Sequence, residues 1–294
     1  MKSTKSLPVV SVLMTAFNRE KYIAEAIESV LASTFKNFEL IIVDDCSKDK
    51  TVQIARKYEG QDSRVRVYIN EENLGDYPNR NRASSYAKGE IIISVDSDDT
   101  IDTNGIAHIV GLFQSFPEAS FLTINRDDFF PEECVVDSQS ILRRHFFEKP
   151  SLFIGPGGTA IKTKDFRRIG GFPTLYGPAN DMYYNLLCAS KSSIILCKFE
   201  FLNYRLHEEQ EQNNKLRYLD NNYKYFNDAL KNLNLFLTDK EKEILLLKNK
   251  RRFLFNTLIF IIKGKNLVSI WKCWRSVSFN FFNILEAIFL LRIK

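Results

Sequence analysis

The sequence predicts an α/β domain, in which a mostly parallel sheet has helices on both faces, followed by a helical C-terminal region. In the first half, short apolar runs rich in Val and Ile alternate with segments whose apolar residues recur at helical spacing. This repeated order of strand, helix and strand is typical of a parallel sheet with crossover helices. After Arg205 the pattern changes to long helical segments. We therefore expect one domain at residues 1–212 and a second region at residues 213–294.

The individual elements follow from local patterns. The first expected helix, for example, has apolar residues at Ile23, Ala26, Ile27 and Val30, which places them on one helical face. Strands are expected at residues 9–14, 40–43, 65–69 and 91–95, and helices at residues 21–32, 51–58, 79–87 and 182–189. The middle, residues 121–163, contains short β-like pieces separated by turn signals.

The composition is that of a folded protein in a reducing compartment. With 294 residues, 45% of them hydrophobic, the chain can bury a large core. Five cysteines make an odd number, and no pair or Cys/His cluster has the sequence spacing of zinc ligands. Residues 1–12 lack the apolar segment of a signal peptide. We therefore expect reduced thiols and a cytoplasmic location.

The C-terminal segment is strongly basic. Residues 248–294 contain ten Lys or Arg residues and one acid, Glu286, so this segment has a charge of +9 and leaves −4 for the rest of the chain. Its apolar clusters, residues 253–262 and 279–291, are too short to reach the roughly 18 apolar residues that span a bilayer. Either a basic amphipathic surface binds the anionic inner face of the cytoplasmic membrane, or a helical subdomain packs on the core. The acidic remainder has no basic groove, so no nucleic acid partner is expected.

Polar residues follow three of the expected strands, at residues 15–18, 44–47 and 96–98. Each loop alone has an ordinary explanation, because Asn18 is suited to capping a helix and Asp45 to stabilising a turn. Parallel strands, however, end at the same edge of a sheet, where open α/β sheets bind ligands. A nucleotide needs a polar partner for its base, an acceptor for its ribose and a cation for its pyrophosphate. The three loops together can supply these groups.

The third loop has the features of a cation site. An apolar run, residues 91–95, ends at the carboxylates of Asp96, Asp98 and Asp99. The Asp-x-Asp spacing lets Asp96 and Asp98 both point outward from the carboxyl edge of the sheet. Their hard oxygen ligands suit Mn²⁺ or Mg²⁺.

Taken in order, these motifs resemble those of family-2 glycosyltransferases with the GT-A fold. The resemblance covers residues 8–212 and rests on residues 8–18 (PVVSVLMTAFN), 41–51 (IIVDDCSKDKT), 73–75 (NLG), 80–81 (RN) and 96–99 (DSDD). It implies a Rossmann-like GT-A sheet and a nucleotide-sugar site that includes Thr15, Phe17, Asn18, Asp45, Arg80, Asp96 and Ser97. In the family, the residue matching Asp45 contacts uracil, and the one matching Arg80 lies near the nucleotide.

The resemblance also implies a catalytic base. Residues 170–172 (GGF) and the pair Asn180-Asp181 resemble the family's GGF…ED stretch, in which the Asp is the base of inverting members. Asn180 replaces the usual Glu, so Asp181 lacks a neighbouring carboxylate that would raise its pKa by like-charge repulsion. Asp181 can also cap the helix expected at residues 182–189, which does not exclude catalysis.

A third metal ligand is implied further along the chain. Residues 204–210 (YRLHEEQ) resemble a YRxHxxQ region in which some members place a metal-binding His. His207 would then join Asp96 and Asp98 at the metal. A lone His near a helix start is otherwise an ordinary surface residue.

The resemblance therefore implies an inverting, metal-dependent glycosyltransferase of the hexosyltransferase type. Mn²⁺ or Mg²⁺ would neutralise the leaving nucleotide diphosphate while Asp181 takes a proton from the acceptor hydroxyl. The implied donor is a nucleotide diphosphate sugar, with UDP favoured, and the implied acceptor is a glycan or a polyprenyl-linked intermediate of bacterial surface polysaccharide.

Two other classes remain open. A sugar nucleotidyltransferase is disfavoured, because residues 15–19 lack the glycine-rich basic loop expected after its first strand. The second class is a catalytically silent nucleotide-sugar-binding module or membrane scaffold, which Asn180 keeps open.

Overall fold

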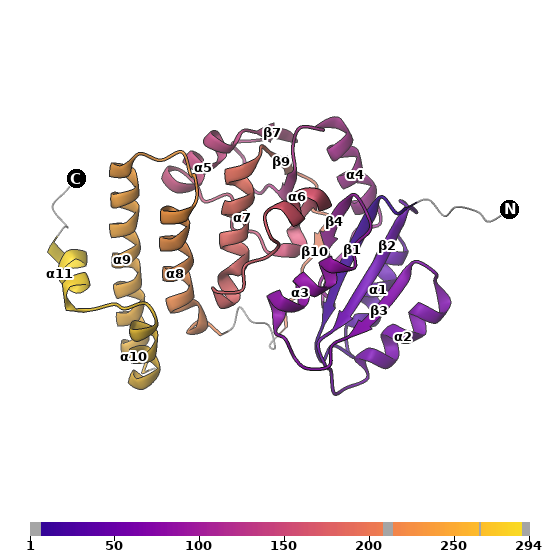
Figure 1. Cartoon of the computed structure of the whole chain (residues 1–294), viewed down its shortest axis with the longest axis horizontal. Coiled ribbons are helices and arrows are strands. Elements are labelled where there is room, and N and C mark those ends of the chain that lie inside the picture. Colours follow the sequence, from indigo (N-terminus) through magenta and orange to yellow (C-terminus); the bar gives the residue numbers. More distant parts are fainter. Residues whose placement is uncertain (1–6, 208–213, 265, 290–294) are drawn as a thin grey trace.

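The computed structural model describes residues 7–207, 214–264 and 266–289 and contains one eight-stranded sheet with the order β3-β2-β1-β4-β8-β6-β9-β7 (Figure 1). The expected domain boundary between residues 212 and 213 lies outside the described residues, as do residues 208–210 of the YRLHEEQ segment.

The N-terminal half of the sheet is parallel. It consists of β1 (Val10–Ala16), β2 (Phe38–Asp44), β3 (Val65–Ile69) and β4 (Ile91–Ser94), connected by α1 (Ile23–Leu31), α2 (Thr51–Gln61) and α3 (Asp76–Ser85). All of the strands and helices expected from the sequence in this half occur, with ends that differ by at most three residues. The regular βα alternation is therefore confirmed.

The other half of the sheet is mixed. Its strands are β6 (Phe121–Ile124), β7 (Cys134–Val136), β8 (Thr159–Lys162) and β9 (Ile194–Cys197), of which β8 and β7 run antiparallel to their neighbours. A separate antiparallel ribbon joins β5 (Thr100–Ile101) to β10 (Leu202–Asn203). The helices here are α4 (Gly105–Ser115), α5 (Ser138–Phe147), α6 (Thr163–Arg168) and α7 (Asn180–Lys191), with 3₁₀ turns at Pro156–Gly158 and Gly177–Ala179.

Helix α5 was not among the elements expected from the sequence, which had indicated short β pieces throughout residues 121–163. Its start is fixed by an N-cap, because the Asp137 side chain accepts a hydrogen bond from the Ser140 N–H at 3.0 Å. The cap signal was present in the sequence, but the surrounding β-like runs obscured it.

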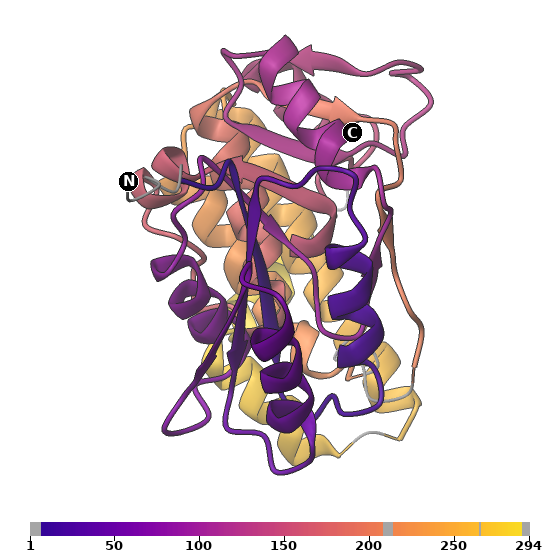
Figure 2. The same cartoon turned by 90° about the vertical axis from the view of Figure 1, so that its right-hand side faces the viewer.

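Alternating strand residues supply two cores, one on each face of the sheet. Met14 contributes to a core with α1, α2 and α4, whereas its neighbour Leu13 contributes to a core with α3 and α5 to α9. Figure 2, viewed from the right of Figure 1, shows the violet N-terminal strands and helices in front and the orange and yellow C-terminal helices behind. Helices on both faces hold the carboxyl ends of β1, β2 and β4 at one edge.

The C-terminal region is helical where it is described. It contains α8 (Arg217–Asn232), α9 (Asp239–Ile262), α10 (Leu267–Ser276) and α11 (Phe281–Phe289). Leu245 on α9 is buried in the second core, and Phe253 packs with Tyr223 of α8 in a third. Asn249 Nδ2 also donates a hydrogen bond to the Tyr223 carbonyl at 3.0 Å. One face of α9 therefore packs on the folded domain through α8.

The basic, partly apolar C-terminal segment was expected to be too interrupted to cross a membrane. Within residues 7–207, 214–264 and 266–289, each helix is too short or too polar to span a bilayer.

Candidate functional site

The structure brings the three polar loops together at the carboxyl edge of the sheet. Asn18 N–H donates to Ser47 Oγ at 2.8 Å, and Asn18 Oδ1 accepts from the Lys48 N–H at 2.8 Å. Ser97 Oγ donates to the carbonyl of Thr15 at 2.8 Å. Loops after β2, β1 and β4 are thus tied to one another, as their order in the sheet requires.

Two loop residues have a backbone conformation that is uncommon for side-chain-bearing residues. Asn18 has a φ of 53° and Cys46 a φ of 68°, both in the left-handed region. Asn is one of the few side-chain-bearing residues that visit this region. Here the Asn18 side chain bonds across to the neighbouring loop, at the Lys48 N–H. Such strain concentrates at ligand sites, where the surrounding structure holds it in place.

Asp45 organises the segment that leads into α3. Its Oδ1 accepts hydrogen bonds from Asn70 Nδ2 at 2.7 Å and from the Leu74 N–H at 2.8 Å, and its Oδ2 accepts from the Gly75 N–H at 2.8 Å. The Asp45 side chain is buried in this arrangement. The structure therefore gives Asp45 a structural role, and contact with a base stays a prediction.

The two carboxylates of the Asp-x-Asp loop each face an arginine. Arg80 Nη1 lies 2.7 Å from Asp96 Oδ1, and Arg19 Nε lies 3.0 Å from Asp98 Oδ2. Burial raises the pKa of Asp96, and Arg80 opposes that rise. Arg80 also pairs with Asp76 through Nε and Oδ1 at 2.7 Å. Each carboxylate of the Asp-x-Asp pair is thus balanced by a guanidinium at the edge where the sequence predicts a nucleotide.

His207 contacts the Asp-x-Asp loop although it lies 109 residues further along the chain. Its Nε2 lies 3.0 Å from Asp98 Oδ2, and its ring stacks on Tyr22 with centroids 5.0 Å apart. The chain reaches this position because β10 pairs with β5 and because the Arg205 N–H donates to Asp99 Oδ1 at 2.9 Å. Burial raises the pKa of Asp99 to about 7. The predicted neighbours Asp98 and His207 are therefore in contact.

Asp98 and His207 are in contact, but the ligand atoms of Asp96, Asp98 and His207 do not all lie within 4.8 Å of one another. The residue types suit a divalent cation, and the three groups would have to draw together around the ion. Asp96 and Asp98 offer carboxylate oxygens, and His207 offers an imidazole nitrogen beside one of them. Oxygen ligands suit Mg²⁺ and Mn²⁺, and imidazole is compatible with the transition metal of that pair.

Asp181 lies in the first turn of α7 and is partly buried. Its Oδ1 accepts a hydrogen bond from the Met182 N–H at 2.8 Å, and its own N–H donates to Tyr77 Oη at 3.3 Å. Burial raises the pKa of Asp181 to about 7, while Arg80 acts in the opposite direction. Position 180 has no carboxylate that could raise the pKa of Asp181 by repulsion. Burial of Asp181 raises it instead.

Asn180 has its own structural task. Only 2% of it is exposed, its Oδ1 accepts from the Tyr176 N–H at 2.9 Å, and its Nδ2 donates to the Gly177 carbonyl at 2.6 Å. It fixes the turn that precedes Asp181. The side chain therefore holds the loop.

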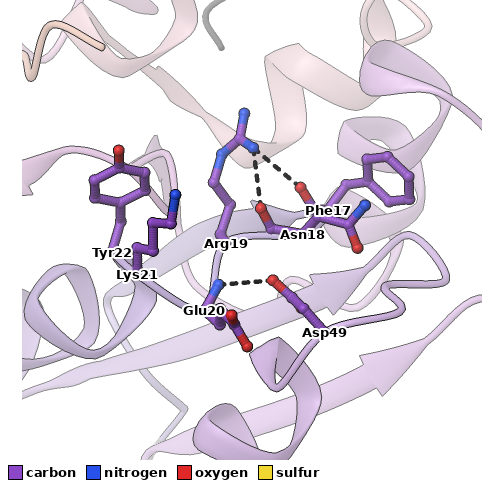
Figure 3. A pocket seen from close by; sticks show the side chains of 7 residues that line it. All are labelled: Phe17, Asn18, Arg19, Glu20, Lys21, Tyr22 and Asp49. Atoms are coloured by element: carbon purple, nitrogen blue, oxygen red, sulfur yellow. Dashed lines mark hydrogen bonds between the residues drawn. The ribbon is translucent and has the colours of Figure 1, made fainter. Parts of the chain in front are cut away.

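A pocket of about 440 Å³ opens beside the β1 loop (Figure 3). It is lined by Phe17, Asn18, Arg19, Glu20, Lys21, Tyr22 and Asp49. Phe17 and Asn18 were expected at the nucleotide, and the Phe17 side chain is 43% exposed. Figure 3 shows the Arg19 guanidinium above the loop, where it donates to the carbonyls of Phe17 and Asn18.

Sequence reasoning missed four residues that shape the site. Arg19 pairs with Asp98, Tyr22 stacks on His207, Asp99 holds the His207 segment, and Tyr77 contacts Asp181. Arg19 and Asp99 directly follow predicted site residues, which was a usable signal. Tyr22 and Tyr77 gave none, because their partners are distant in the chain.

Comparison with known proteins places the chain in a family. The family model described as glycosyl transferase family 2 matches residues 11–167, just over half of the chain. Glycosyltransferase GlyG of Streptococcus pneumoniae serotype 4 is 31% identical over 179 residues, which are 55% of this chain and 59% of GlyG. The chain thus matches less than two thirds of GlyG.

Two further proteins are similar over longer stretches. WfgD of Escherichia coli, a UDP-Glc:alpha-D-GlcNAc-diphosphoundecaprenol beta-1,3-glucosyltransferase, is 28% identical over 229 residues, covering 76% of this chain and 87% of WfgD. Residues 1–349 of S. aureus TarS in complex with UDP superpose with a TM-score of 0.64 at 23% identity, covering 83% of this chain and 71% of that one. The TarS likeness confirms the fold. The chain belongs to glycosyl transferase family 2, a family of glycosyltransferase enzymes.

Proposed function

We propose that this chain is an inverting, metal-dependent glycosyltransferase that moves a hexose from a UDP-sugar to a lipid-linked or glycan acceptor of a surface polysaccharide. The observation that supports it best is the contact of Asp98 with His207 at the edge that also holds Asp96. Arg80 connects that edge to the candidate base, because it pairs with Asp96 and acts on the pKa of Asp181. The proposed cation site and the proposed base therefore adjoin a single arginine.

The donor nucleotide would occupy the β1 and β2 loops. Phe17 presents an exposed ring for stacking on a base, and Thr15, Asn18 and Asp45 are polar residues of the same edge. Ser97 holds the metal loop against β1 through its hydroxyl. UDP is the nucleotide in the TarS complex, and UDP-Glc is the donor in WfgD's name, which supports a uridine nucleotide here.

Asp96, Asp98 and His207 would hold Mn²⁺ or Mg²⁺. When bound, the ion neutralises the charge that accumulates on the leaving diphosphate. Arg80 and Arg19, which now pair with the two carboxylates, would assist by offsetting negative charge at the same place.

Asp181 would act as the base. With a pKa of about 7, the carboxylate is a stronger proton acceptor than an ordinary Asp and is still largely ionised slightly above neutral pH. It would take the proton from the acceptor hydroxyl as that oxygen attacks the anomeric carbon from the side opposite the diphosphate. A single displacement inverts the anomeric configuration.

A lipid-linked acceptor would bring the enzyme to a membrane, and α9 to α11 offer a suitable surface. We name as the apolar–basic surface the exposed residues Phe255, Leu258, Ile262, Lys263, Leu267, Trp271, Lys272, Arg275, Phe281 and Phe282. These helices lie at the end of the molecule farthest from β3 (Figure 1). Basic residues among exposed apolar ones favour an anionic lipid surface at the inner face of the cytoplasmic membrane.

The competing proposal of a silent binding module rested on Asn180. Its two hydrogen bonds to the turn before α7 give it a structural reason that does not depend on lost catalysis. The presence of Asn180 therefore does not favour an inactive protein, and Asp181 remains as the candidate base.

Titration calorimetry with UDP tests the donor site. We expect UDP to bind in Mn²⁺, and binding to become much weaker with chelator or in the double variant Asp96→Ala/Asp98→Ala. Asp128→Ala, at an exposed carboxylate, is the matched control and should bind like the wild type. If no nucleotide diphosphate binds in a metal-dependent way, a membrane-associated scaffold becomes the better account.

A further inference from the structure

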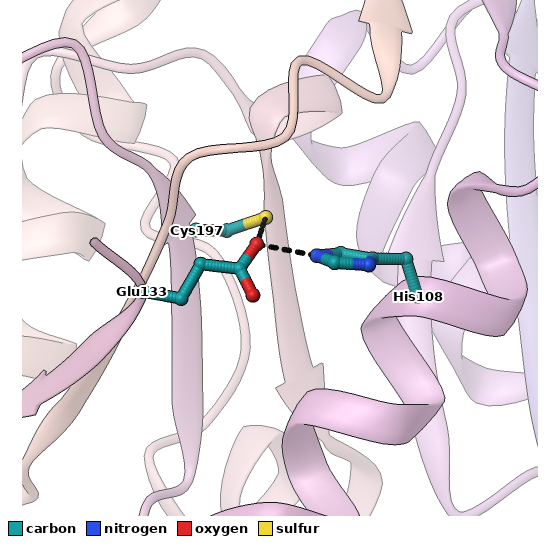
Figure 4. A group of neighbouring side chains, drawn as sticks. All are labelled: His108, Glu133 and Cys197. Carbon is teal, nitrogen blue, oxygen red and sulfur yellow. Dashed lines mark hydrogen bonds and ion pairs between the residues drawn. The ribbon is translucent and has the colours of Figure 1, made fainter. Parts of the chain in front are cut away.

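Three metal-ligating side chains meet outside the candidate donor site. His108 lies on α4, Glu133 directly precedes β7, and Cys197 ends β9 (Figure 4). His108 Nε2 is 2.5 Å from Glu133 Oε1, and Cys197 Sγ is 3.8 Å from the same oxygen. All three ligand atoms lie within 4.8 Å of one another. In Figure 4 the side chains converge from three separate elements.

The sheet register produces this convergence. The antiparallel pairing of β7 with β9 places Cys134 opposite Leu196, so the residues just beyond, Glu133 and Cys197, come together. His108 reaches them from α4, which packs on the core that contains Cys197. The sequence spacing had indicated no zinc site, because the separations of 25 and 64 residues between Glu133 and its two partners match no known short motif.

Phe199 orients two of the three side chains. Its ring lies 5.0 Å from the His108 ring, and its carbonyl accepts a hydrogen bond from Cys197 Sγ at 3.4 Å. The imidazole and the thiol are therefore held by groups other than Glu133. The contact with the His108 ring can persist when a metal binds and orient the imidazole. The Cys197 hydrogen bond is lost with the thiol proton.

The chemistry of the set selects among metals. A thiolate, an imidazole and a carboxylate form a borderline-soft ligand set that suits Zn²⁺ rather than Mg²⁺ or Ca²⁺. Tetrahedral zinc with bonds of about 2.0–2.3 Å places its ligand atoms roughly 3.3–3.7 Å apart. The Cys197–Glu133 separation is near this value. The His108–Glu133 pair would need to open by about 1 Å to match it.

That opening is accessible. The side chains of His108 and Glu133 are 34% and 28% exposed, so a rotation of either one moves into solvent, and an ion can enter from the same side. A water molecule can supply the fourth ligand, as it does in three-ligand zinc sites. Cys197, by contrast, is buried, and burial raises the pKa of its thiol to about 12, so binding would displace the thiol proton.

We propose that His108, Glu133 and Cys197 bind one Zn²⁺ ion that fastens the start of β7 to α4 and β9. The site shares no residue with Asp96, Asp98 and His207, and its thiol distinguishes it from that set of ligands. Zinc would cross-link α4, β9 and the start of β7, which the sheet pairing and the His108–Glu133 hydrogen bond now connect. Its role is structural stabilisation of the segment that leads into β7.

Cobalt substitution tests the site directly. The full chain, freed of metal by a chelator and kept reduced, is titrated with Co²⁺ in excess Mg²⁺, and the sulfur-to-cobalt charge-transfer absorption is recorded. We expect one equivalent of Co²⁺ to produce the band, Zn²⁺ to abolish it by displacement, and Zn²⁺ to raise the melting temperature of the protein.

Matched variants assign the ligands. Cys197→Ser should remove the band, and Glu133→Gln and His108→Ala should weaken Co²⁺ binding at least tenfold, whereas the neighbouring changes Cys134→Ser and Glu132→Gln should leave it unchanged. Because Cys197 is buried, circular dichroism must confirm that its variant is folded. If it is not, the partly exposed Glu133 still provides the test.

Other results would overturn the zinc site. A wild-type protein that gives no thiolate band, or a band that persists in Glu133→Gln and His108→Ala, would leave these residues as a hydrogen-bonded pair beside a thiol. Zinc binding that is lost in Asp96→Ala/Asp98→Ala and kept in the three ligand variants would assign the ion to the donor site. Neither result bears on UDP binding, so the two proposals are tested separately.

Discussion

Nε2 of His207 lies 3.0 Å from Oδ2 of Asp98, although the two residues are 109 positions apart in the chain. The ribbon formed by β5 and β10 produces this contact by returning the chain to the carboxyl edge of the sheet. Residues 204–207 thus bring the His207 imidazole to the Asp-x-Asp loop, where it would add a nitrogen ligand to the proposed cation site.

Replacing His207 should weaken the Mn²⁺-dependent part of UDP binding. We expect His207→Ala to reduce UDP affinity about tenfold or more in Mn²⁺, close to 1.4 kcal/mol, because one ligand of the ion is lost. Weak binding in chelator should not change. Calorimetric titration in both conditions measures the two values, and Leu206→Ala, at a 76% exposed neighbour, is the control. Equal losses with and without Mn²⁺ would show that His207 does not contact the metal.

Asp181→Asn should separate chemistry from binding. Removing a general base lowers turnover by about 10²–10⁴-fold, while UDP affinity in Mn²⁺ should stay within twofold because Asp181 lies outside the ligand set. Transfer from UDP-sugars measured beside calorimetry checks both. Asp239→Asn, an exposed carboxylate at the start of α9, should retain turnover. An active Asp181→Asn enzyme would move the base to another residue.

The raised pKa of Asp181 predicts a pH profile. Its value of about 7 in the folded protein means that the base is protonated below neutral pH, so kcat/KM should rise through a limb near pH 7. Stability should show the opposite trend. Because the folded pKa exceeds the usual value of 3.8, ionisation destabilises the fold as pH rises from about 4 to 7.

That linkage gives a second measurement on the same variant. Asp181→Asn cannot ionise, so urea unfolding should find it more stable than the wild type at pH 8, by on the order of 1 kcal/mol, and little different at pH 4. A variant that is equally stabilised at both values would exclude the titration of Asp181 as the cause.

Much of the fold could be predicted because the βα half follows local rules. Most strands from Val10 to Ser94 are apolar runs, and α1 repeats its apolar residues at helical spacing. The polar helix α3 lacks that repeat. The mixed half resisted prediction because its short strands pair across long separations, as β6 does with β9. Helix α5 was hidden among β-like runs, although Asp137 marked its start.

The candidate site divides in the same way. Residues on the strand ends, such as Asp45 and Asp98, were visible as motifs, and the sheet brought their loops together. The raised pKa of Asp181 was not foreseeable from its neighbour in sequence, because it comes from burial. The contact of Tyr22 with His207 and the cluster around Cys197 depend on tertiary packing, which no local pattern encodes.

Asn180 should matter for stability rather than for catalysis. Asn180→Ala leaves the Tyr176 N–H without its partner, and an unsatisfied buried group costs roughly 1–3 kcal/mol. The Gly177 carbonyl loses one hydrogen bond but keeps the one from the backbone N–H of residue 180. We expect a loss of that size in the free energy of unfolding, measured by urea titration. Asn232→Ala, at an exposed position on α8, is the control. Asn180→Glu should lose stability too, and a gain in its turnover would instead make position 180 part of the catalytic machinery.

The apolar–basic surface can be tested without disturbing the fold. Truncation after residue 247 would cut α9 in its middle and remove Phe253 from its core, so loss of binding would have two explanations. Surface substitutions avoid this. The triple variant Trp271→Ser/Phe281→Ser/Phe282→Ser changes side chains that are 56%, 66% and 73% exposed.

In flotation with vesicles, the wild type should bind phosphatidylglycerol membranes at low salt and detach as salt rises, because each basic residue near the surface contributes about 1 kcal/mol. The triple variant should stay unbound, and Leu7→Ser/Leu175→Ser, at apolar residues of similar exposure outside α9 to α11, should bind like the wild type. Equal binding to neutral phosphatidylcholine vesicles would exclude a contribution of the basic residues to membrane binding. A different result would make this surface an interface between copies of the chain. In that case the wild type binds neither kind of vesicle and is an oligomer, whereas the triple variant is a monomer.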